Sequence, residues 1–263
     1  MSEWVPVFTS AQVRAAEKPL LEEGKPLMLW AARALAMVTA DELVEPGASE
    51  AEGYPQFPGQ GGAPLIGRVL VLAGKGDNGG DALFAAAALL QWMPQRAASA
   101  EPPADDLHID VFCTAGEAHA QALATALAAG AERIELADVI ARAARYDIIL
   151  DGILGIGATM NAALRGDARN VVTALLPHVR FGRPRVIAVD LPSGLHPDEG
   201  TTADDVVLPA SVTVTFGAMK PGLDTDRGRE LAGATVFVDF DLPFTEPPLT
   251  SAPVAYALVG RPQ

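Results

Sequence analysis

The sequence predicts an α/β protein: a three-layer α/β/α, Rossmann-like fold whose mostly parallel, doubly wound sheet is preceded by N-terminal helices. Two observations predict this class. Short apolar runs rich in β-branched residues alternate along the chain with helical runs rich in Ala and Leu. The composition is 49% hydrophobic but only 6% aromatic, so small aliphatic side chains must build the core, as they do where helices pack on a parallel sheet. With 263 residues, the chain is long enough to form this fold as a single domain over residues 1–263.

The segment ahead of the first strand is expected to be helical. Residues 8–43 show the spacing of one or two amphipathic helices, and Ser10 is expected to cap the first. Residues 46–64 are rich in Pro, Gly and Glu and lack periodicity, which is typical of a surface loop. Residues 94–106 form a second insertion of Pro, Ala and acidic residues.

From residue 68 onward, strands and helices alternate. Apolar runs predict strands at 68–73, 109–114, 133–136, 147–150, 185–189, 212–216 and 235–240. Helical runs are expected at 82–92, 117–129, 137–144 and 168–176. Pro177 is expected to stop the last of these helices, because proline disrupts a helix interior. The Pro-rich tail after Phe244 either covers the edge of the sheet or stays loose.

The charge and the cysteine content exclude several classes of protein. A formal net charge of −14 argues against nucleic-acid partners and against binding to anionic membranes. Cys113 is the only cysteine, so a disulfide within the chain is impossible, and we expect it to be buried. The chain shows neither a secretory leader nor an apolar stretch long enough to span a bilayer. We therefore expect a cytoplasmic protein that does not associate with membranes.

The segment 74–81, with the sequence GKGDNGGD, lies between the first predicted strand and its helix. Glycines at such a turn let the backbone approach a ligand, and the free N–H groups of the first helical turn attract anions. The pattern matches G-x-G-x-x-G, yet the second strand ends in the sequence CTAG, without the acid that holds a ribose in dehydrogenases. No Gly-Lys-Ser/Thr follows, which excludes a P-loop. Asp81 either faces the ligand or is a favourable acid in the first helical turn.

Two further acids end predicted strands. Asp151 precedes a glycine-containing segment and either faces a ligand or caps a turn, and Asp190 begins the sequence DLPSG. Ligands bind open α/β sheets at the carboxyl ends of the strands, so these acids and Asp81 are expected at one edge. The oxygen atoms of Asn78, Asp151 and Ser193 are hard donors that suit an alkali or alkaline-earth cation rather than zinc. Lys220 follows the strand at 212–216 and either meets a phosphate or lies in a solvated loop.

Taken in order, these blocks resemble the NAD(P)H-hydrate epimerase family, also called the YjeF N-terminal domain family. The resemblance is carried by five blocks: residues 8–14 with Leu27-Met28, then 74–81, 151–157, 189–194 and 213–222. The family interconverts the R and S epimers of hydrated NADH and NADPH (NADHX and NADPHX) at carbon 6 of the nicotinamide ring. The resemblance implies that this chain is an isomerase in nicotinamide cofactor repair.

The resemblance also implies a set of site residues. The substrate-binding residues would be Asp77, Asn78, Gly79, Gly80, Asp81, Gly155, Ile156, Gly157, Ala158, Thr159, Met160, Asn161 and Asp190. A potassium ion would bind Asn78, Asp151 and Ser193, the three oxygen donors already singled out. Asp190 is hypothesised to be the catalytic acid/base at the hydrated carbon.

Several positions depart from the family pattern. Asp77 replaces an Asn and Ala82 a Gly, and the extra charge of Asp77 would weaken phosphate binding or favour NADHX over NADPHX. Leu29 and Ala32 stand where the family carries an acid and a Gly, and the loop 158–165 is about two residues longer than the common form. Many bacterial relatives continue into a dehydratase domain; that activity is not expected of this chain, so a separate NAD(P)H-hydrate dehydratase is expected as its pathway partner. The family also implies a homodimer, for which the apolar stretch 27–30 offers an interface.

Two alternatives compete with the epimerase. The substitutions leave room for a non-catalytic ligand-binding or scaffolding protein on the same fold, although the retained acids argue against it. An ordinary NAD(P)-dependent oxidoreductase is disfavoured, because the ribose-binding acid is missing.

Overall fold

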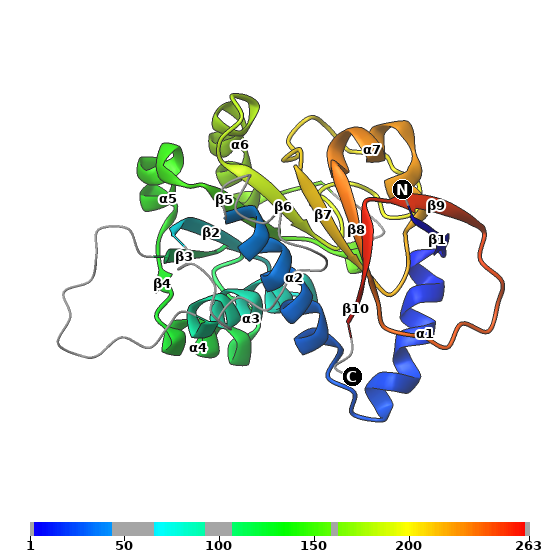
Figure 1. The fold of residues 1–263 in the computed structure, drawn as a ribbon. Coiled ribbons are helices and arrows are strands. Elements are labelled where there is room, and N and C mark those ends of the chain that lie inside the picture. The colour runs from blue at the N-terminus through cyan, green and yellow to red at the C-terminus, as the bar shows by residue number, and fades with distance from the viewer. Residues whose placement is uncertain (1–2, 44–65, 93–106, 159–162, 261–263) are drawn as a thin grey trace, which may run out of the picture.

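A parallel sheet forms the centre of the computed structural model, which describes residues 3–43, 66–92, 107–158 and 163–260 (Figure 1). Its eight strands are all parallel and lie in the order β10-β8-β7-β6-β5-β2-β3-β4. The strands are β2 (Gly67–Ala73), β3 (Leu107–Cys113), β4 (Glu132–Arg133), β5 (Ile148–Gly152), β6 (Arg185–Val189), β7 (Val212–Phe216), β8 (Ala234–Asp239) and β10 (Tyr256–Val259). The chain runs outward from β2 to β4 and then returns to β5, so the strand order reverses between β2 and β5.

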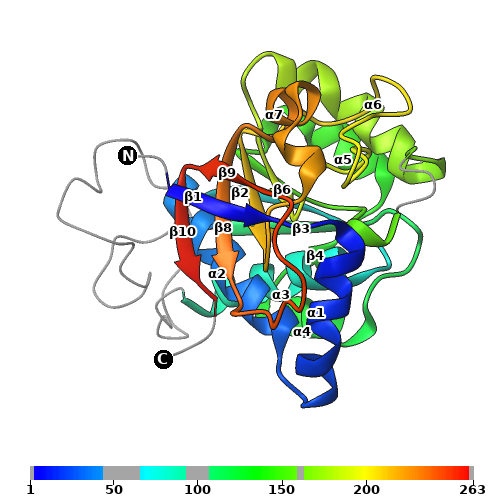
Figure 2. The ribbon, with the colours of Figure 1, turned by 90° about the vertical axis from the view of Figure 1, so that its right-hand side faces the viewer.

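Helices cover both faces of the sheet, which confirms the predicted three-layer fold (Figures 1 and 2). One face packs against α2 (Leu27–Leu43), α3 (Asp77–Trp92) and α4 (Ala120–Ala129), and the other against α5 (Leu136–Arg142) and α6 (Gly166–Arg180). Successive strand residues serve opposite faces, because side chains alternate along a strand. Val69 and Val71 join the core under α2 and α3, whereas Leu70 and Leu72 join the core under α6.

The two ends of the chain meet in a small second sheet. β1 (Glu3–Val7) pairs antiparallel with β9 (Thr250–Val254), and β1 leads into α1 (Ser10–Glu22) (Figure 2). A third apolar cluster forms beneath this pair from both strands, from the segment after β6 and from α7 (Asp226–Ala232). The tail after Phe244 therefore covers the edge of the sheet, and β10 adds its last strand. The sequence patterns predicted none of β1, β9 and β10.

Two predictions at helix ends are wrong. Thr9, not Ser10, caps α1: its hydroxyl accepts the Gln12 N–H at 3.2 Å, and the Gln12 side chain accepts the Thr9 N–H at 2.9 Å. Ser10 instead donates its hydroxyl to Asp198. Pro177 does not stop α6, which continues to Arg180. The buried face of α6 ahead of the proline packs on the sheet, and this packing offsets the roughly 3 kcal/mol that an interior proline costs.

The remaining boundaries move by a few residues. α3 begins at Asp77, five residues before the expected start, so most of the glycine-rich segment is helical. α4 begins at Ala120, three residues after the expected start. The predicted loops at 46–64 and 94–106 lie outside the described residues.

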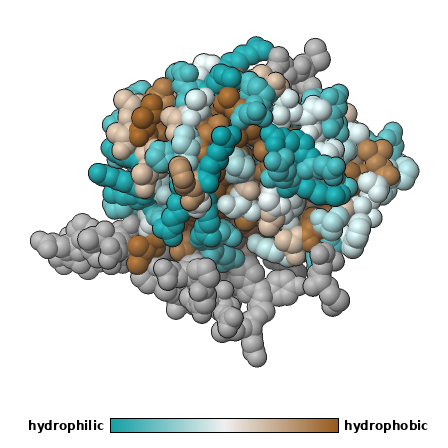
Figure 3. Space-filling model, turned by 90° about the horizontal axis from the view of Figure 1, so that it is seen from above, coloured by the Kyte–Doolittle hydropathy of each residue, from teal (hydrophilic) through white to brown (hydrophobic). Residues whose placement is uncertain are grey.

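No helix in the described part of the chain is long and apolar enough to cross a membrane. Seen from above, hydrophobic residues are scattered among hydrophilic ones on the surface (Figure 3).

Candidate active site

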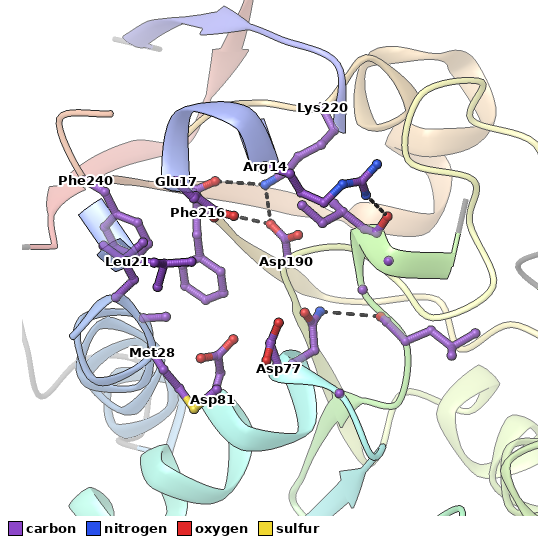
Figure 4. Close-up of a pocket in the computed structure, with 18 of the residues that line it drawn as sticks. Arg14, Glu17, Leu21, Met28, Asp77, Asp81, Asp190, Phe216, Lys220 and Phe240 are labelled. Carbon is purple, nitrogen blue, oxygen red and sulfur yellow. Dashed lines mark hydrogen bonds and ion pairs between the residues drawn. The ribbon is translucent and has the colours of Figure 1, made fainter. Parts of the chain in front are cut away.

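A cavity of about 570 Å³ opens at the carboxyl ends of the strands, beside the reversal of strand order between β2 and β5. α1 and α2 form one wall, and the first turn of α3 and the segment after β5 form another (Figure 4). The predicted site residues that line it are Asp77, Asn78, Asp81, Gly155, Ile156, Gly157, Asp190 and Lys220. Gly79 and Gly80 lie buried in the α3 turn behind the lining, and Ala158 ends a short 3₁₀ turn. Thr159, Met160 and Asn161 lie outside the described residues.

The glycine-rich segment folds tightly against its neighbours. A Cβ on Gly79 would lie 2.1 Å from the Gly74 carbonyl oxygen, so only glycine permits this close approach. A Cβ on Gly155 would lie 2.1 Å from the Asn78 Oδ1. The first turn of α3 lines the cavity, and the first N–H groups of a helix, which have no partner within the helix, can hold an anionic group.

Asp190 occupies a strained position at the end of β6. Its φ of 68° lies in the left-handed region, which few residues other than glycine adopt. Its Oδ1 accepts the fully buried Lys220 ammonium, the Thr215 hydroxyl at 3.2 Å and the Phe216 N–H at 3.3 Å. Asp190 Oδ2 accepts no hydrogen bond from the described residues. The contacts of Oδ1 hold the strained backbone and leave Oδ2 for a ligand.

Lys220 does not lie in a solvated loop, because its side chain is fully buried. The ammonium donates to Asp190, to the Thr215 hydroxyl at 3.1 Å and to the Phe216 carbonyl at 2.8 Å. These three acceptors match its three N–H donors, which disfavours the predicted contact with a phosphate.

Three more carboxyl groups line the cavity, those of Asp77, Asp81 and Glu17, and the sequence analysis missed Glu17 on α1 (Figure 4). The pKa of Glu17 is raised to about 7: burial is the largest cause, Lys220 opposes it, Asp190 and Asp77 add to it, and Arg14 lowers it. Burial also raises the pKa of Asp81 well above its usual range, with smaller contributions from Asp190, Asp77 and Glu17. Glu17 follows Val13 by one helical turn, and an acid on the apolar stripe of α1 was the available signal.

The three predicted cation ligands form a cluster of oxygen donors beside the cavity. Asp151 is buried and accepts the Ser193 N–H at 2.9 Å, and the Ser193 hydroxyl accepts the Leu154 N–H at 2.9 Å. Asn78 donates its Nδ2 to the carbonyls of Leu154 and Val189, which leaves its Oδ1 as an acceptor. Burial raises the pKa of Asp151, and the hydrogen bonds from Ser193 oppose this. Asp151 forms no ion pair with any described residue.

Two departures from the family pattern lie on α2. Ala32 is packed in the core under the sheet, whereas Leu29 is 50% exposed. Leu27 and Met28 line the cavity, and Trp30 packs edge-on against Phe240. Three residues of the proposed dimer stretch 27–30 therefore serve the cavity and the core, and only Leu29 is exposed.

A cavity at the reversal point of a parallel sheet, beside a glycine-rich helix start and acidic strand ends, defines a Rossmann-like domain with a small-molecule site. Within that class, the chain belongs to the family described as YjeF-related protein N-terminus, whose model matches residues 24–222.

Relatives with known names agree with this assignment. The NAD(P)H-hydrate epimerase of Microbacterium testaceum is 49% identical over 92% of this chain and 80% of its own length. The bifunctional NAD(P)H-hydrate repair enzyme Nnr of Mycobacterium tuberculosis is 31% identical over 80% of this chain and 37% of its own length. The crystal structure of the yeast protein ynu0 superposes with a TM-score of 0.63 and 19% identity, covering 88% of this chain and 86% of that one. That last likeness bears on the fold alone.

Proposed function

We propose that the chain is an NAD(P)H-hydrate epimerase, an isomerase that interconverts the R and S epimers of NADHX and NADPHX. The observation that carries the proposal is the geometry of Asp190. One of its oxygens is fixed by Lys220, while the other, on the wall of the cavity, accepts no hydrogen bond from the residues that the structure describes. The name of the Microbacterium testaceum relative supports the same activity. No feature of the described residues favours a non-catalytic scaffold or an oxidoreductase.

The walls of the cavity suit the two parts of such a substrate. The N–H groups at the start of α3 and the segment from Gly155 to Gly157 would hold its phosphates. The side chains of Leu21, Phe216 and Phe240 offer an apolar wall for a ring. Asp77 places a negative charge beside the α3 turn and would disfavour the more highly charged NADPHX.

Asp190 would act on the hydrated carbon. Epimerisation requires that water leave carbon 6 and return to the other face of the ring, with a proton moved at each step. A positioned carboxylate can accept the proton of the returning water, and such acid–base assistance contributes ~10²–10⁴-fold. The donors on Oδ1 orient the carboxylate, so that Oδ2 is directed to this task.

The residues Asn78, Asp151 and Ser193 fit a potassium ion. All three supply oxygen atoms, and Asp151 is a buried carboxyl group without a basic partner among the described residues. A cation held there would offset the charge of Asp151 and fix the segments that carry Gly155 and Asp190.

We further propose three properties that follow from the assignment. A separate NAD(P)H-hydrate dehydratase would consume the S epimer, as the bifunctional name of the Mycobacterium tuberculosis relative suggests. The protein would work in the cytoplasm and as a homodimer. Size-exclusion chromatography with light scattering tests the dimer.

The test of the function is epimer exchange. Purified protein is given the R epimer of NADHX, and its conversion to S is followed by chromatography, with and without potassium, at a pH where spontaneous exchange is slow. We expect accelerated exchange that Asp190→Asn lowers by ~10²-fold or more. Binding of NADHX without acceleration would instead mean a ligand-binding protein, and hydride transfer to a second substrate would mean an oxidoreductase.

A further inference from the structure

Glu17 projects from α1 into the cavity and belongs to none of the predicted site residues. We propose that Glu17 is a second catalytic residue of this site, the acid that protonates the departing hydroxyl group while Asp190 serves the returning water. The inference rests on the proposed function and assigns the proton transfers within it.

The position of Glu17 is fixed by the packing of its helix. Val13, one turn before it, is fully buried, and Ala16 is 5% exposed, so α1 cannot turn Glu17 away from the cavity without exposing them. The helix is anchored by bonds from Ser10 to Asp198 at 2.7 Å and from Arg14 to the Ile156 carbonyl at 2.7 Å. The carboxyl group of Glu17 therefore faces the same space as Asp190 (Figure 4).

The two carboxyl groups have opposite environments. Asp190 accepts three hydrogen bonds on one oxygen, one of them a charge-assisted bond from the Lys220 ammonium. Glu17 accepts no hydrogen bond from the described residues, and burial disfavours its charge. A site whose environments separate two carboxyl groups in this way assigns one as acid and the other as base.

The charges around Glu17 come from every wall of the cavity. Lys220 and Asp190 face it from the strand ends, Asp77 and Asp81 from α3, and Arg14 from its own helix. The two cations and the three acids affect the pKa of Glu17 less than burial does. That pKa is about 7, so Glu17 can exchange its proton near neutral pH. Asp81 is buried more deeply than Glu17, and this burial raises the pKa of Asp81 well above its usual range.

The proton transfers balance over one cycle. Glu17 gives its proton to the hydroxyl oxygen on carbon 6, the C–O bond breaks, and water leaves with the bonding electrons. The electron pair of the ring nitrogen stabilises the resulting cation. A water molecule then adds to the other face and gives its proton to Asp190. That proton returns to Glu17 through solvent, so both residues are regenerated and no oxidant or reductant is used.

Glu17→Gln tests the assignment, with Glu22→Gln as the matched control on an exposed turn of the same helix, where Glu22 pairs only with Lys18 among the described residues. Exchange of R-NADHX is measured from pH 6 to 8.5, with the spontaneous rate subtracted. The wild-type kcat is expected to fall as the pH rises through about 7, because only the protonated form of Glu17 is an acid. Glu17→Gln should lose roughly 10²-fold in kcat, with little change in KM, and should lose this inflection. Glu22→Gln should match the wild type.

Glu17→Asp keeps a carboxyl group and is expected to retain measurable exchange with a pH inflection, while thermal unfolding checks that each variant is folded. Full kcat with an unchanged inflection in Glu17→Gln would overturn this inference and leave the epimerase intact. Absence of exchange by the wild-type protein would overturn the proposed function, and this inference with it.

Discussion

Asp190 and Asp110 are buried aspartates on the same sheet, and their surroundings differ in one instructive respect. Arg142 donates to both oxygens of Asp110, at 3.2 and 3.1 Å, and the Tyr146 hydroxyl adds a bond of 2.7 Å. Asp190 has a comparable cation in Lys220, but the side-chain hydrogen bonds that it accepts from the described residues converge on Oδ1, and its backbone is in the left-handed region. In the structural pair, both oxygens of Asp110 accept hydrogen bonds. In the cavity pair, one oxygen of Asp190 can bind a ligand, and its backbone is strained, as is common at functional sites.

The largest effect is expected from removing the cation of the cavity pair. Lys220→Met leaves the buried Asp190 charge unpaired, so we expect the free energy of unfolding to fall by about 3–5 kcal/mol, measured by urea denaturation. The double variant Lys220→Met with Asp190→Asn removes the unpaired charge and should recover part of that loss. A single variant as stable as the wild type would mean that the ion pair contributes nothing to the fold.

The structural pair should show a smaller effect on stability and none on catalysis. Asp110→Asn removes the charge that binds Arg142 and Tyr146, at a cost of about 2 kcal/mol in the free energy of unfolding. Epimer exchange by the folded variant should equal that of the wild type. If the folded Asp110→Asn variant lost epimer exchange, Asp110 would also serve catalysis, and the contrast with Asp190 would be wrong.

Asp151 offers a third case, a buried carboxyl group with no cation among the described residues. If potassium supplies that charge, potassium at ten times its Kd should stabilise the folded protein by about 1.4 kcal/mol. Thermal unfolding in potassium chloride is compared with choline chloride at equal ionic strength, and Asp151→Asn should abolish the difference. Equal stabilisation of the wild type and the variant would place the ion elsewhere.

The smallest effect is expected at Asp77, whose carboxylate stands in the first turn of α3. Asp77→Asn removes a negative charge beside the expected phosphates, so binding of NADPHX should improve relative to NADHX by roughly threefold, as for other weakly coupled charges. Titration calorimetry with both ligands measures the ratio. An unchanged ratio would show that the additional phosphate of NADPHX lies far from Asp77.

Local pattern was sufficient for most of the sheet and for part of the site. The strand at 212–216 was predicted with its observed bounds, because a β-branched run is a strong local signal. Asp190 was placed at the cavity from the rule that strand ends share one edge, and the structure lines the cavity with it. Its catalytic role, and the cation at Asn78, Asp151 and Ser193, stay predictions.

Long-range contacts account for what the sequence patterns missed. β1 pairs with β9 across almost the whole chain, and short, half-exposed strands of this kind become recognisable only with their partner present. Lys220 follows a predicted strand, yet its burial depends on Asp190, thirty residues earlier. Glu17 has the local pattern of a helix residue, and its raised pKa arises from segments that close over it.

The amino-acid sequence by itself determined the α/β class, the strand ends that carry acids and the glycine-rich helix start, because each follows from the character of a few adjacent residues. Only the tertiary structure decided which acids have a raised pKa, which oxygen of Asp190 accepts the hydrogen bonds, and which helix brings Glu17 to the cavity. Those properties depend on burial and on hydrogen-bond partners, and both are set by residues far apart in the chain.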